Sequence, residues 1–145
     1  MASSLFDMKD KTVLVTGAAG LLGQQHARAL LDCGARLIIT DISEKSLNLA
    51  KDKLQVDFPK SNIIILKLDV TDRSSIEKTY SFLSDLKIVV NVLINNAAID
   101  AKVKKDGDIS NSSKFEDFTD FQWDLELSVG LKGAFLCSQI FGKDM

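Results

Sequence analysis

Three glycines with regular spacing mark the part of the sequence that is best suited to chemistry. Gly17, Gly20 and Gly23 lie between a short apolar run and a segment of helix length. In such a unit the first glycine permits a tight turn, the second lets the backbone approach a pyrophosphate, and the third lets helix and strand pack closely. N–H groups at the start of the helix then face the phosphate oxygens. The residues predicted to hold a dinucleotide at this turn are Gly17, Ala19, Gly20, Leu21, Leu22 and Gly23.

An acidic residue follows the second apolar run of the chain. Asp41 lies 18 residues after Gly23, where a carboxylate accepts hydrogen bonds from the adenosine ribose hydroxyls and repels a 2′-phosphate. The glycine turn also carries no Arg or Lys that would pair with such a phosphate. NAD is therefore predicted as the cofactor and NADP is disfavoured. The position alone leaves a second interpretation, in which Asp41 caps a helix or stabilises a turn.

Four short apolar runs alternate with segments of helix length. Each run is rich in Val, Ile and Leu and is mostly uninterrupted, which is typical of strands buried on both faces of a parallel sheet. The runs are residues 12–16, 37–40, 63–68 and 92–94. This alternation predicts an α/β fold with a doubly wound parallel sheet and right-handed crossovers.

Capping residues mark the boundaries of the first three helices. The first spans about 21–33 and stops at Gly34, the second runs from Ser43 to before Pro59, and the third starts near Thr71 and Asp72. The residues predicted to share one face are Leu22, His26, Ala29, Leu30 and Cys33 in the first helix, Leu47, Ala50 and Leu54 in the second, and Ile76, Tyr80 and Leu83 in the third. That face of the first helix is expected to be the core side, so His26 is predicted to pack rather than to catalyse.

A last helix is predicted to start near Thr119 and to continue to Met145. Gln122 lies three residues after Thr119 and completes a capping box. The polar stretch 101–114 before it is expected to be a long loop whose lysines are solvated. The residues expected to form an apolar stripe on the last helix are Trp123, Leu127, Leu131, Ala134 and Ser138.

The composition predicts one globular domain over residues 1–145. Hydrophobic residues are 46% and charged residues 26%, and the net charge of −2 offers no attraction for nucleic acid or an anionic membrane. Cys33 and Cys137 form no C-x-x-C pair and there is one histidine, so reduced thiols and no metal site are expected. The charged N-terminus and the lack of a run of about 18 apolar residues favour a cytoplasmic protein without membrane contact.

Four segments of the chain resemble the short-chain dehydrogenase/reductase family, from about Lys9 to the last residue. They are the glycine turn, residues 68–72 (LDVTD), residues 95–98 (NNAA) and residues 128–135 (SVGLKGAF). The resemblance implies that Asp69 holds the adenine amino group and that Val70 packs on the adenine ring. It also implies that the segment with Asn96, Ala97 and Ala98 steadies the central sheet and lines the cofactor, although Ala98 replaces the usual glycine.

The resemblance implies an oxidoreductase that moves a hydride between NAD and a small alcohol or carbonyl substrate. The chain would be its NAD(P)-binding Rossmann-type domain, incomplete on the C-terminal side and truncated in or after its last helix. The intact enzyme is expected to be a homo-oligomer.

Two departures concern the catalytic residues of the family. Its active-site Asn falls at Gly130, and its Tyr-x-x-x-Lys pair has no counterpart because Tyr80, the one tyrosine, is followed four residues later by Ser84. No catalytic residue is therefore assigned within the chain, and the pair is expected beyond Met145. The alternative is a non-catalytic dinucleotide-binding module that is complete as it stands.

Overall fold

Four parallel strands form the sheet of the computed structural model, which describes residues 6–99 and 115–145. The expected loop 101–114 lies outside the described residues. The strands are β1 (Thr12–Val15), β2 (Arg36–Asp41), β3 (Ile63–Lys67) and β4 (Val92–Ile94), in the order β3-β2-β1-β4. Because the chain moves outward from β1 to β3 and then returns to the other side of β1, the order reverses between β1 and β4, as in a doubly wound fold. The predicted fold class is confirmed.

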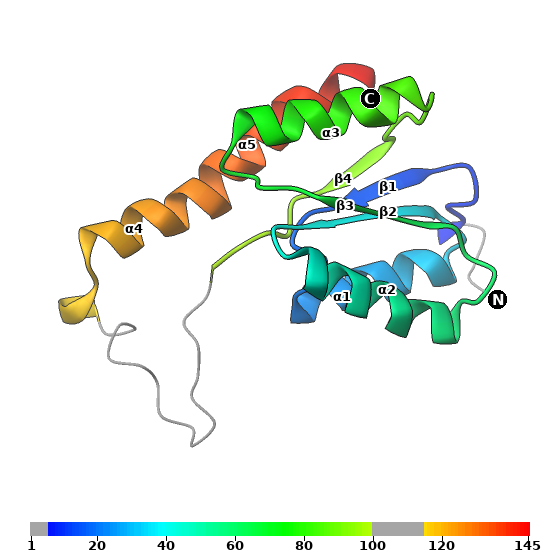
Figure 1. Ribbon diagram of the computed structural model, residues 1–145, viewed down its shortest axis with the longest axis horizontal. Coiled ribbons are helices and arrows are strands. Elements are labelled where there is room, and N and C mark those ends of the chain that lie inside the picture. The colour runs from blue at the N-terminus through cyan, green and yellow to red at the C-terminus, as the bar shows by residue number, and fades with distance from the viewer. Residues whose placement is uncertain (1–5, 100–114) are drawn as a thin grey trace.

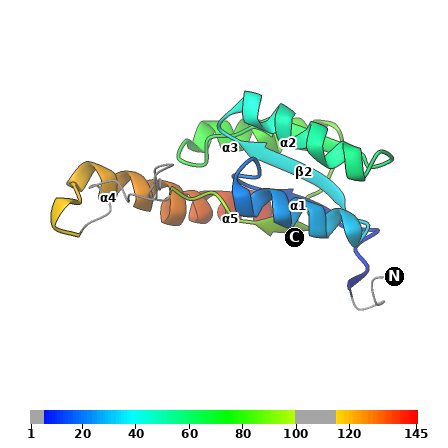
Figure 2. The same ribbon diagram turned by 90° about the horizontal axis from the view of Figure 1, so that it is seen from below.

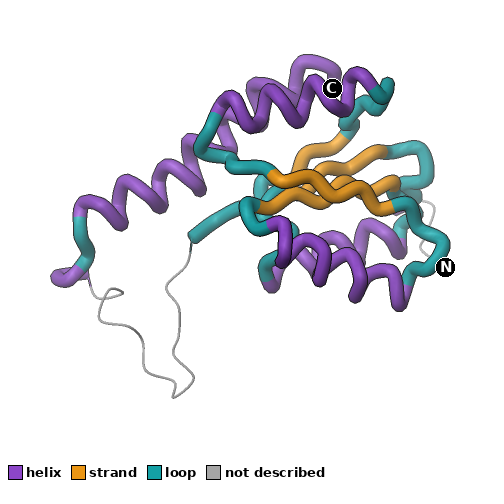
Figure 3. The backbone as a smooth tube through the Cα atoms, in the orientation of Figure 1, coloured by secondary structure: helices purple, strands orange, loops and turns teal. Residues whose placement is uncertain are grey.

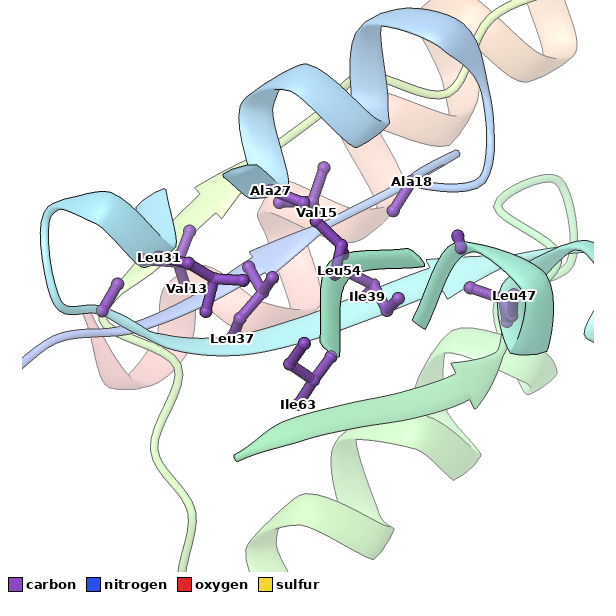
Figure 4. Close-up of a cluster of buried hydrophobic side chains, with 12 residues drawn as sticks. Val13, Val15, Ala18, Ala27, Leu31, Leu37, Ile39, Leu47, Leu54 and Ile63 are labelled. Carbon is purple, nitrogen blue, oxygen red and sulfur yellow. The ribbon is translucent and has the colours of Figure 1, made fainter. Parts of the chain in front are cut away.

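Helices cover both faces of this sheet. Helices α1 (Leu21–Asp32) and α2 (Glu44–Asp57) lie on one face, and α3 (Arg73–Asp85) and α5 (Gly133–Phe141) lie on the other (Figures 1 and 3). Successive strand residues point to opposite faces, so Val13 and Val15 pack toward α1 and α2 whereas Leu14 packs toward α3 and α5. Figure 4 shows the first of these two cores, with side chains from β1, β2, β3, α1 and α2.

The capping residues predicted from the sequence occupy their expected positions. The Ser43 side chain accepts a hydrogen bond from the N–H of Ser46, and the Asp72 side chain accepts one from Ser74. Thr119 and Gln122 form the capping box of α4 (Asp120–Leu127). The buried face of α2 is the predicted one, and Cys33 and Cys137 are free thiols. None of the described helices combines the length and apolar character that crossing a membrane requires.

The buried face of α1 differs from the predicted one. Gly23, Ala27 and Leu31 face the sheet, whereas His26 is exposed, so the expectation that His26 faces the core is wrong. The hydrophobic pattern favoured the larger apolar side chains. Packing instead places the small residues inward, because the start of α1 lies directly against the glycine turn. A Cβ on Gly23 would be 2.5 Å from the Gly17 carbonyl oxygen.

The C-terminal helix is not one continuous α-helix. A 3₁₀ turn (Phe115–Asp117) precedes α4, a π-helical segment (Ser128–Lys132) joins α4 to α5, and α5 ends at Phe141 before a second 3₁₀ turn (Gly142–Asp144). The expectation of a helix that continues to Met145 is therefore wrong. α4 extends away from the body of the molecule (Figures 1 and 2).

The C-terminal elements carry an apolar face that the sequence pattern missed. The residues of α5 that pack on the sheet and α3 are Gly133, Leu136, Cys137, Ile140 and Phe141. The predicted stripe exists but faces outward, since Trp123 is 56% exposed and Leu131 is 68% exposed.

Candidate cofactor site

A cleft of about 320 Å³ lies at the carboxyl edge of the sheet. All four strands contribute to its walls through the residues that follow them, and Leu125 and Val129 add a wall from α4 and the π-helical segment. The predicted cofactor residues that line this cleft are Gly17, Asp41, Asp69, Val70, Ala97 and Ala98. The strand ends beside a reversal of strand order are the usual place for a ligand in such a sheet.

The glycine turn at one end of the cleft leaves no space for a side chain at Gly17 or Gly23. Gly17 has a φ of 61°, and a Cβ there would be 2.7 Å from the Cα of Ala97. Gly23 packs with equal tightness on the turn itself. The predicted roles of these two glycines, a tight turn and a close helix contact, agree with the geometry.

The start of α1 offers free backbone donors beside this turn. Gly20 is the N-cap, and its lack of a side chain leaves the first N–H groups of the helix without a side-chain acceptor. Leu21 and Leu22 are 81% and 65% exposed. The N–H groups and the positive end of the helix dipole are therefore accessible to an anion.

Thr16 and Asn96 join the glycine turn to the chain segment after β4. The Thr16 Oγ1 accepts hydrogen bonds from the N–H groups of Asn96 (3.0 Å) and Ala97 (3.1 Å). The Asn96 Nδ2 donates to the carbonyl oxygens of Thr16 (2.9 Å) and Gly17 (3.0 Å). Asn96 thus bonds to the turn with its side chain, so its position is structural, and Ala97 and Ala98 supply the adjacent wall of the cleft.

Asp41 connects the glycine turn to the start of α2. Its Oδ2 accepts a hydrogen bond from the N–H of Ala19 (3.2 Å), and its Oδ1 accepts one from the N–H of Ser43 (3.0 Å). The side chain therefore stabilises turns, as the second interpretation of the sequence held. It also lines the cleft, and an ionised carboxylate has acceptor positions beyond these two.

Asp69 and Val70 form the wall of the cleft beyond β3. The Asp69 Oδ1 accepts hydrogen bonds from the N–H (2.9 Å) and the Oγ1 (2.7 Å) of Thr71. Val70 is 8% exposed and lies against Gly133 of α5, where a Cβ would be 2.8 Å from the Val70 Cγ2. This contact attaches the cleft wall to α5.

Gly130 lies in the π-helical segment, one residue after Val129. A Cβ built on Gly130 would meet nothing within 4 Å. Single π-helical turns inside α-helices are frequent at functional sites. Because a Cβ on Gly130 would touch nothing, packing does not require glycine at this position, and the space beside it is open.

Tyr80 does not line this cleft but a separate pocket, together with residues 87–90, which precede β4. It packs edge-on against Phe141 at a centroid distance of 6.0 Å, and its hydroxyl donates to Asp144 at 2.6 Å. This hydrogen bond raises the pKa of Tyr80 above its usual value, whereas a catalytic tyrosine needs a lowered pKa. Burial likewise raises the pKa of the Cys137 thiol to about 11, which makes it a poor nucleophile.

The sequence pattern missed several residues of the site. Thr16 ends the first apolar run, directly before the first glycine, and a hydroxyl at that point was a usable signal. Ile42 is 61% exposed directly after Asp41, which local apolar periodicity cannot flag. The cleft-lining residues that were not predicted are Ile42, Leu68, Thr71, Ile99, Leu125 and Val129.

A family model described as short chain dehydrogenase matches residues 11–145 of the chain. The chain belongs to the short-chain dehydrogenase family. A short chain dehydrogenase/reductase of Macrophomina phaseolina is 30% identical over 134 residues, which are 92% of this chain and 71% of that protein. The NAD-dependent glycerol dehydrogenase of Listeria innocua is 29% identical over 140 residues, which are 97% of this chain and 49% of that enzyme.

Solved structures of the short-chain dehydrogenase family share this fold. The crystal structure of levodione reductase matches with a TM-score of 0.79 and 27% identity, over 95% of this chain and 50% of that chain. The chain thus spans about half the length of levodione reductase and of the Listeria enzyme. The expectation that the sheet is incomplete on its C-terminal side, relative to solved members of the family, is confirmed.

Membership in this family of oxidoreductases implies a nicotinamide cofactor. The described residues fit such a cofactor in two independent respects. The uncapped start of α1 offers donors for a pyrophosphate, and the carboxylate of Asp41 lies in the same cleft as the wall formed by Asp69 and Val70.

Proposed function

We propose that the chain is the cofactor-binding part of a dehydrogenase/reductase that moves a hydride between NAD and the carbon of an alcohol or carbonyl group. The observation that supports this proposal is the cleft at the carboxyl edge, where an uncapped helix start and a carboxylate follow adjacent strands. When bound, NAD supplies the redox chemistry, and the protein binds and orients it.

Each predicted cofactor residue has a role in this proposal. Gly17, Gly20 and Gly23 keep the turn and the start of α1 open to the pyrophosphate, with Ala19, Leu21 and Leu22 beside it. Asp41 accepts hydrogen bonds from the adenosine ribose. The adenine lies by Asp69 and Val70, and the nicotinamide end by the wall formed by Ala97 and Ala98, with Asn96 holding that wall on the turn.

The preference for NAD follows from the charge of Asp41. A carboxylate in the cleft repels the 2′-phosphate of NADP, and the printed name of the Listeria relative describes that enzyme as NAD-dependent. Calorimetry with NAD and NADP on the unmodified chain tests this choice. NADP binding as tightly as NAD would contradict it.

Gly20→Val tests the placement of the pyrophosphate. Gly20 has φ −72° and ψ 173°, an extended conformation that valine tolerates. A Cβ there would lie 3.3 Å from the Gly17 carbonyl oxygen, so the turn must shift by a few tenths of an ångström, and the side chain would enter the phosphate position. We expect NAD affinity to fall about ten-fold or more, a change of about 1.4 kcal/mol. Gly142→Val, where a Cβ meets nothing within 4 Å, is the matched control. Unchanged affinity in Gly20→Val would overturn the assignment of the turn.

A non-catalytic binding module is the second candidate function, and Gly130 is the observation in its favour. In either case residues 1–145 alone should show no NADH formation with alcohols, since acid/base catalysis is typically worth about 10²–10⁴-fold and Tyr80 does not line the cleft. The coding sequence downstream of codon 145 separates the two candidates. An in-frame Tyr-x-x-x-Lys supports the dehydrogenase, and its absence supports the binding module.

We also propose that the protein is a homo-oligomer that uses the outward face of α4, the π-helical segment and α5. A shallow groove there is lined by Leu127, Leu131 and Phe135, with Asp124 and Lys132 beside them. Asp124 and Lys132 lie four residues on either side of Ser128, so an antiparallel pairing of two copies would place each Asp124 beside the partner's Lys132.

Light scattering on the chain and on Leu131→Glu tests this interface. Leu131 is 68% exposed, so the substitution should leave the fold intact and convert the oligomer to a monomer. Val56→Glu, on a residue of α2 that is 80% exposed, is the matched control and should remain oligomeric. A monomeric unmodified chain would contradict the proposal.

A further inference from the structure

Asp41 makes two contacts that do not involve a nucleotide. Its two carboxylate oxygens accept hydrogen bonds from two different loops, the glycine turn through Ala19 and the start of α2 through Ser43. The neighbouring residue pair adds a third link, because the N–H of Ala18 donates to the carbonyl oxygen of Thr40 at 2.9 Å. The turn is thus attached to the end of β2 at two successive residues.

These contacts use a property that only an ionised carboxylate offers at this position. Two oxygens accept from two N–H groups at once, whereas an asparagine would present an NH₂ group to one of those donors. Hydrogen bonds to an ionised acceptor are also roughly twice as strong as neutral ones. Two of the roughly four acceptor positions of the carboxylate remain for other donors.

We propose that Asp41 is a positioning residue that holds the glycine turn in its binding-competent shape before any nucleotide arrives. This proposal rests on the proposed cofactor function and deepens it. Charge repulsion alone would predict that loss of the Asp41 carboxylate improves NADP binding, whereas the positioning role predicts that it weakens NADP binding. Removal of the carboxylate would relieve repulsion of NADP, but it would also release the Ala19 N–H and loosen the pyrophosphate site. Binding of both dinucleotides should therefore weaken, and a switch to NADP would require another acceptor for the turn.

Binding of two nucleotide probes can distinguish support of the glycine turn by Asp41 from a direct hydrogen bond between Asp41 and the ribose. ADP carries both ribose hydroxyls, and 2′,3′-dideoxy-ADP carries neither, so the second probe cannot report a hydrogen bond between Asp41 and the ribose. We expect Asp41→Ala, which removes both acceptor oxygens, to weaken binding of dideoxy-ADP about ten-fold. Loss of one negative charge beside an anionic probe would by itself strengthen binding, so a fall in affinity identifies the lost support of the turn. Unchanged or tighter binding of dideoxy-ADP would overturn the proposal.

Asp72→Ala is the matched control for a general loss of stability. Asp72 also accepts a backbone hydrogen bond near a helix start, from Ser74 at 2.9 Å, but it is the N-cap of α3 and does not line the cleft. This variant should bind dideoxy-ADP as the unmodified chain does. A loss equal to that of Asp41→Ala would show a non-specific effect and contradict the proposal.

Amide hydrogen exchange supplies a test without any nucleotide. In the unmodified chain the Ala19 amide should exchange at least about ten-fold more slowly than the amides of Leu21 and Leu22, which begin α1 without a side-chain acceptor. This measurement needs no variant and is independent of the proposed function. Exchange of the Ala19 amide at the rate of those two amides would overturn the positioning role, even if NAD binds.

Discussion

The two ends of the cleft are built in different ways. At the glycine turn, the side chains of Thr16 and Asp41 accept hydrogen bonds and the side chain of Asn96 donates them, and these bonds join the ends of three strands. At the π-helical segment, the wall consists of one helical arm whose residues Leu125 and Val129 reach the cleft. A Cβ on Gly23 would lie 2.5 Å from backbone, whereas a Cβ on Gly130 would meet nothing. The glycine turn therefore has no room for a side chain at Gly23, whereas the π-helical segment has room for one at Gly130.

Paired substitutions of these two glycines should produce the largest difference. Gly23→Ala places a methyl group 2.5 Å from the Gly17 oxygen and 2.6 Å from the Ala18 Cα, so we expect the free energy of unfolding to fall by about 3 kcal/mol. Gly130→Ala should raise it by about 0.5–1 kcal/mol, because alanine loses less backbone entropy in a helix. Urea unfolding followed by circular dichroism measures both changes. Equal changes in the free energy of unfolding for the two variants would contradict the proposed difference in packing between the two ends of the cleft.

The two neighbouring asparagines after β4 provide a second, smaller contrast. Asn96 donates two hydrogen bonds to the partly buried turn, whereas Asn95 donates one, to Ser138 at 3.0 Å, in an exposed position. Asn96→Ala leaves two carbonyl groups without this donor and should lower the free energy of unfolding by about 2 kcal/mol. Asn95→Ala should lower it by about 0.5 kcal/mol. A larger loss in Asn95→Ala would show that the contact with α5 contributes more to stability than the contact with the turn.

The smallest expected effect is a pH dependence at the far end of α5. The hydrogen bond to Asp144 raises the pKa of Tyr80 above 10.0 in the folded chain. A raised pKa stabilises the fold below the pKa of an unfolded tyrosine, about 10, and this contribution is lost as the pH rises through the folded value. The absorbance of tyrosinate as a function of pH measures the pKa of Tyr80, and the signal comes from this residue alone because the chain has one tyrosine.

Asp144→Asn is the partner variant for this titration. It removes the charge of the acceptor, so the pKa of Tyr80 should move down toward its usual value. Lys143, whose Nζ lies 5.9 Å from the Tyr80 ring centroid, gives the control Lys143→Gln, which should leave the upward shift in place. A titration midpoint at or below 10.0 in the unmodified chain would contradict the described contact.

Local signals in the sequence were sufficient for most of the fold. Strands buried on both faces, the caps at Ser43, Asp72 and Thr119, and the glycine spacing all act over a few residues, so they could be predicted without tertiary information. The buried face of α1 could not, because it depends on Gly23, which a hydrophobic pattern does not count. The connection of Asn96 to Thr16 spans 80 residues and likewise has no local signal.

The residues of the candidate site likewise include some that local sequence signals predict and others that they do not. Gly17, Asp41, Asp69 and Ala97 were predicted and line the cleft, because each lies at a strand end or within three residues of one. Leu125 and Val129 were missed, since the sequence predicted one regular helix where the structure has a π-helical segment between α4 and α5.

That segment also lets the C-terminal arm absorb a deletion. A π-helical turn holds one residue more than the α-helical turn it replaces, and each α-helical residue rotates the chain by about 100°. Removal of Gly130, where a Cβ would meet nothing within 4 Å, would let the arm become regular α-helix while α4 and α5 keep the faces they now present. Leu125 would therefore stay at the cleft, whereas the same deletion in a regular α-helix would rotate everything before it by about 100°.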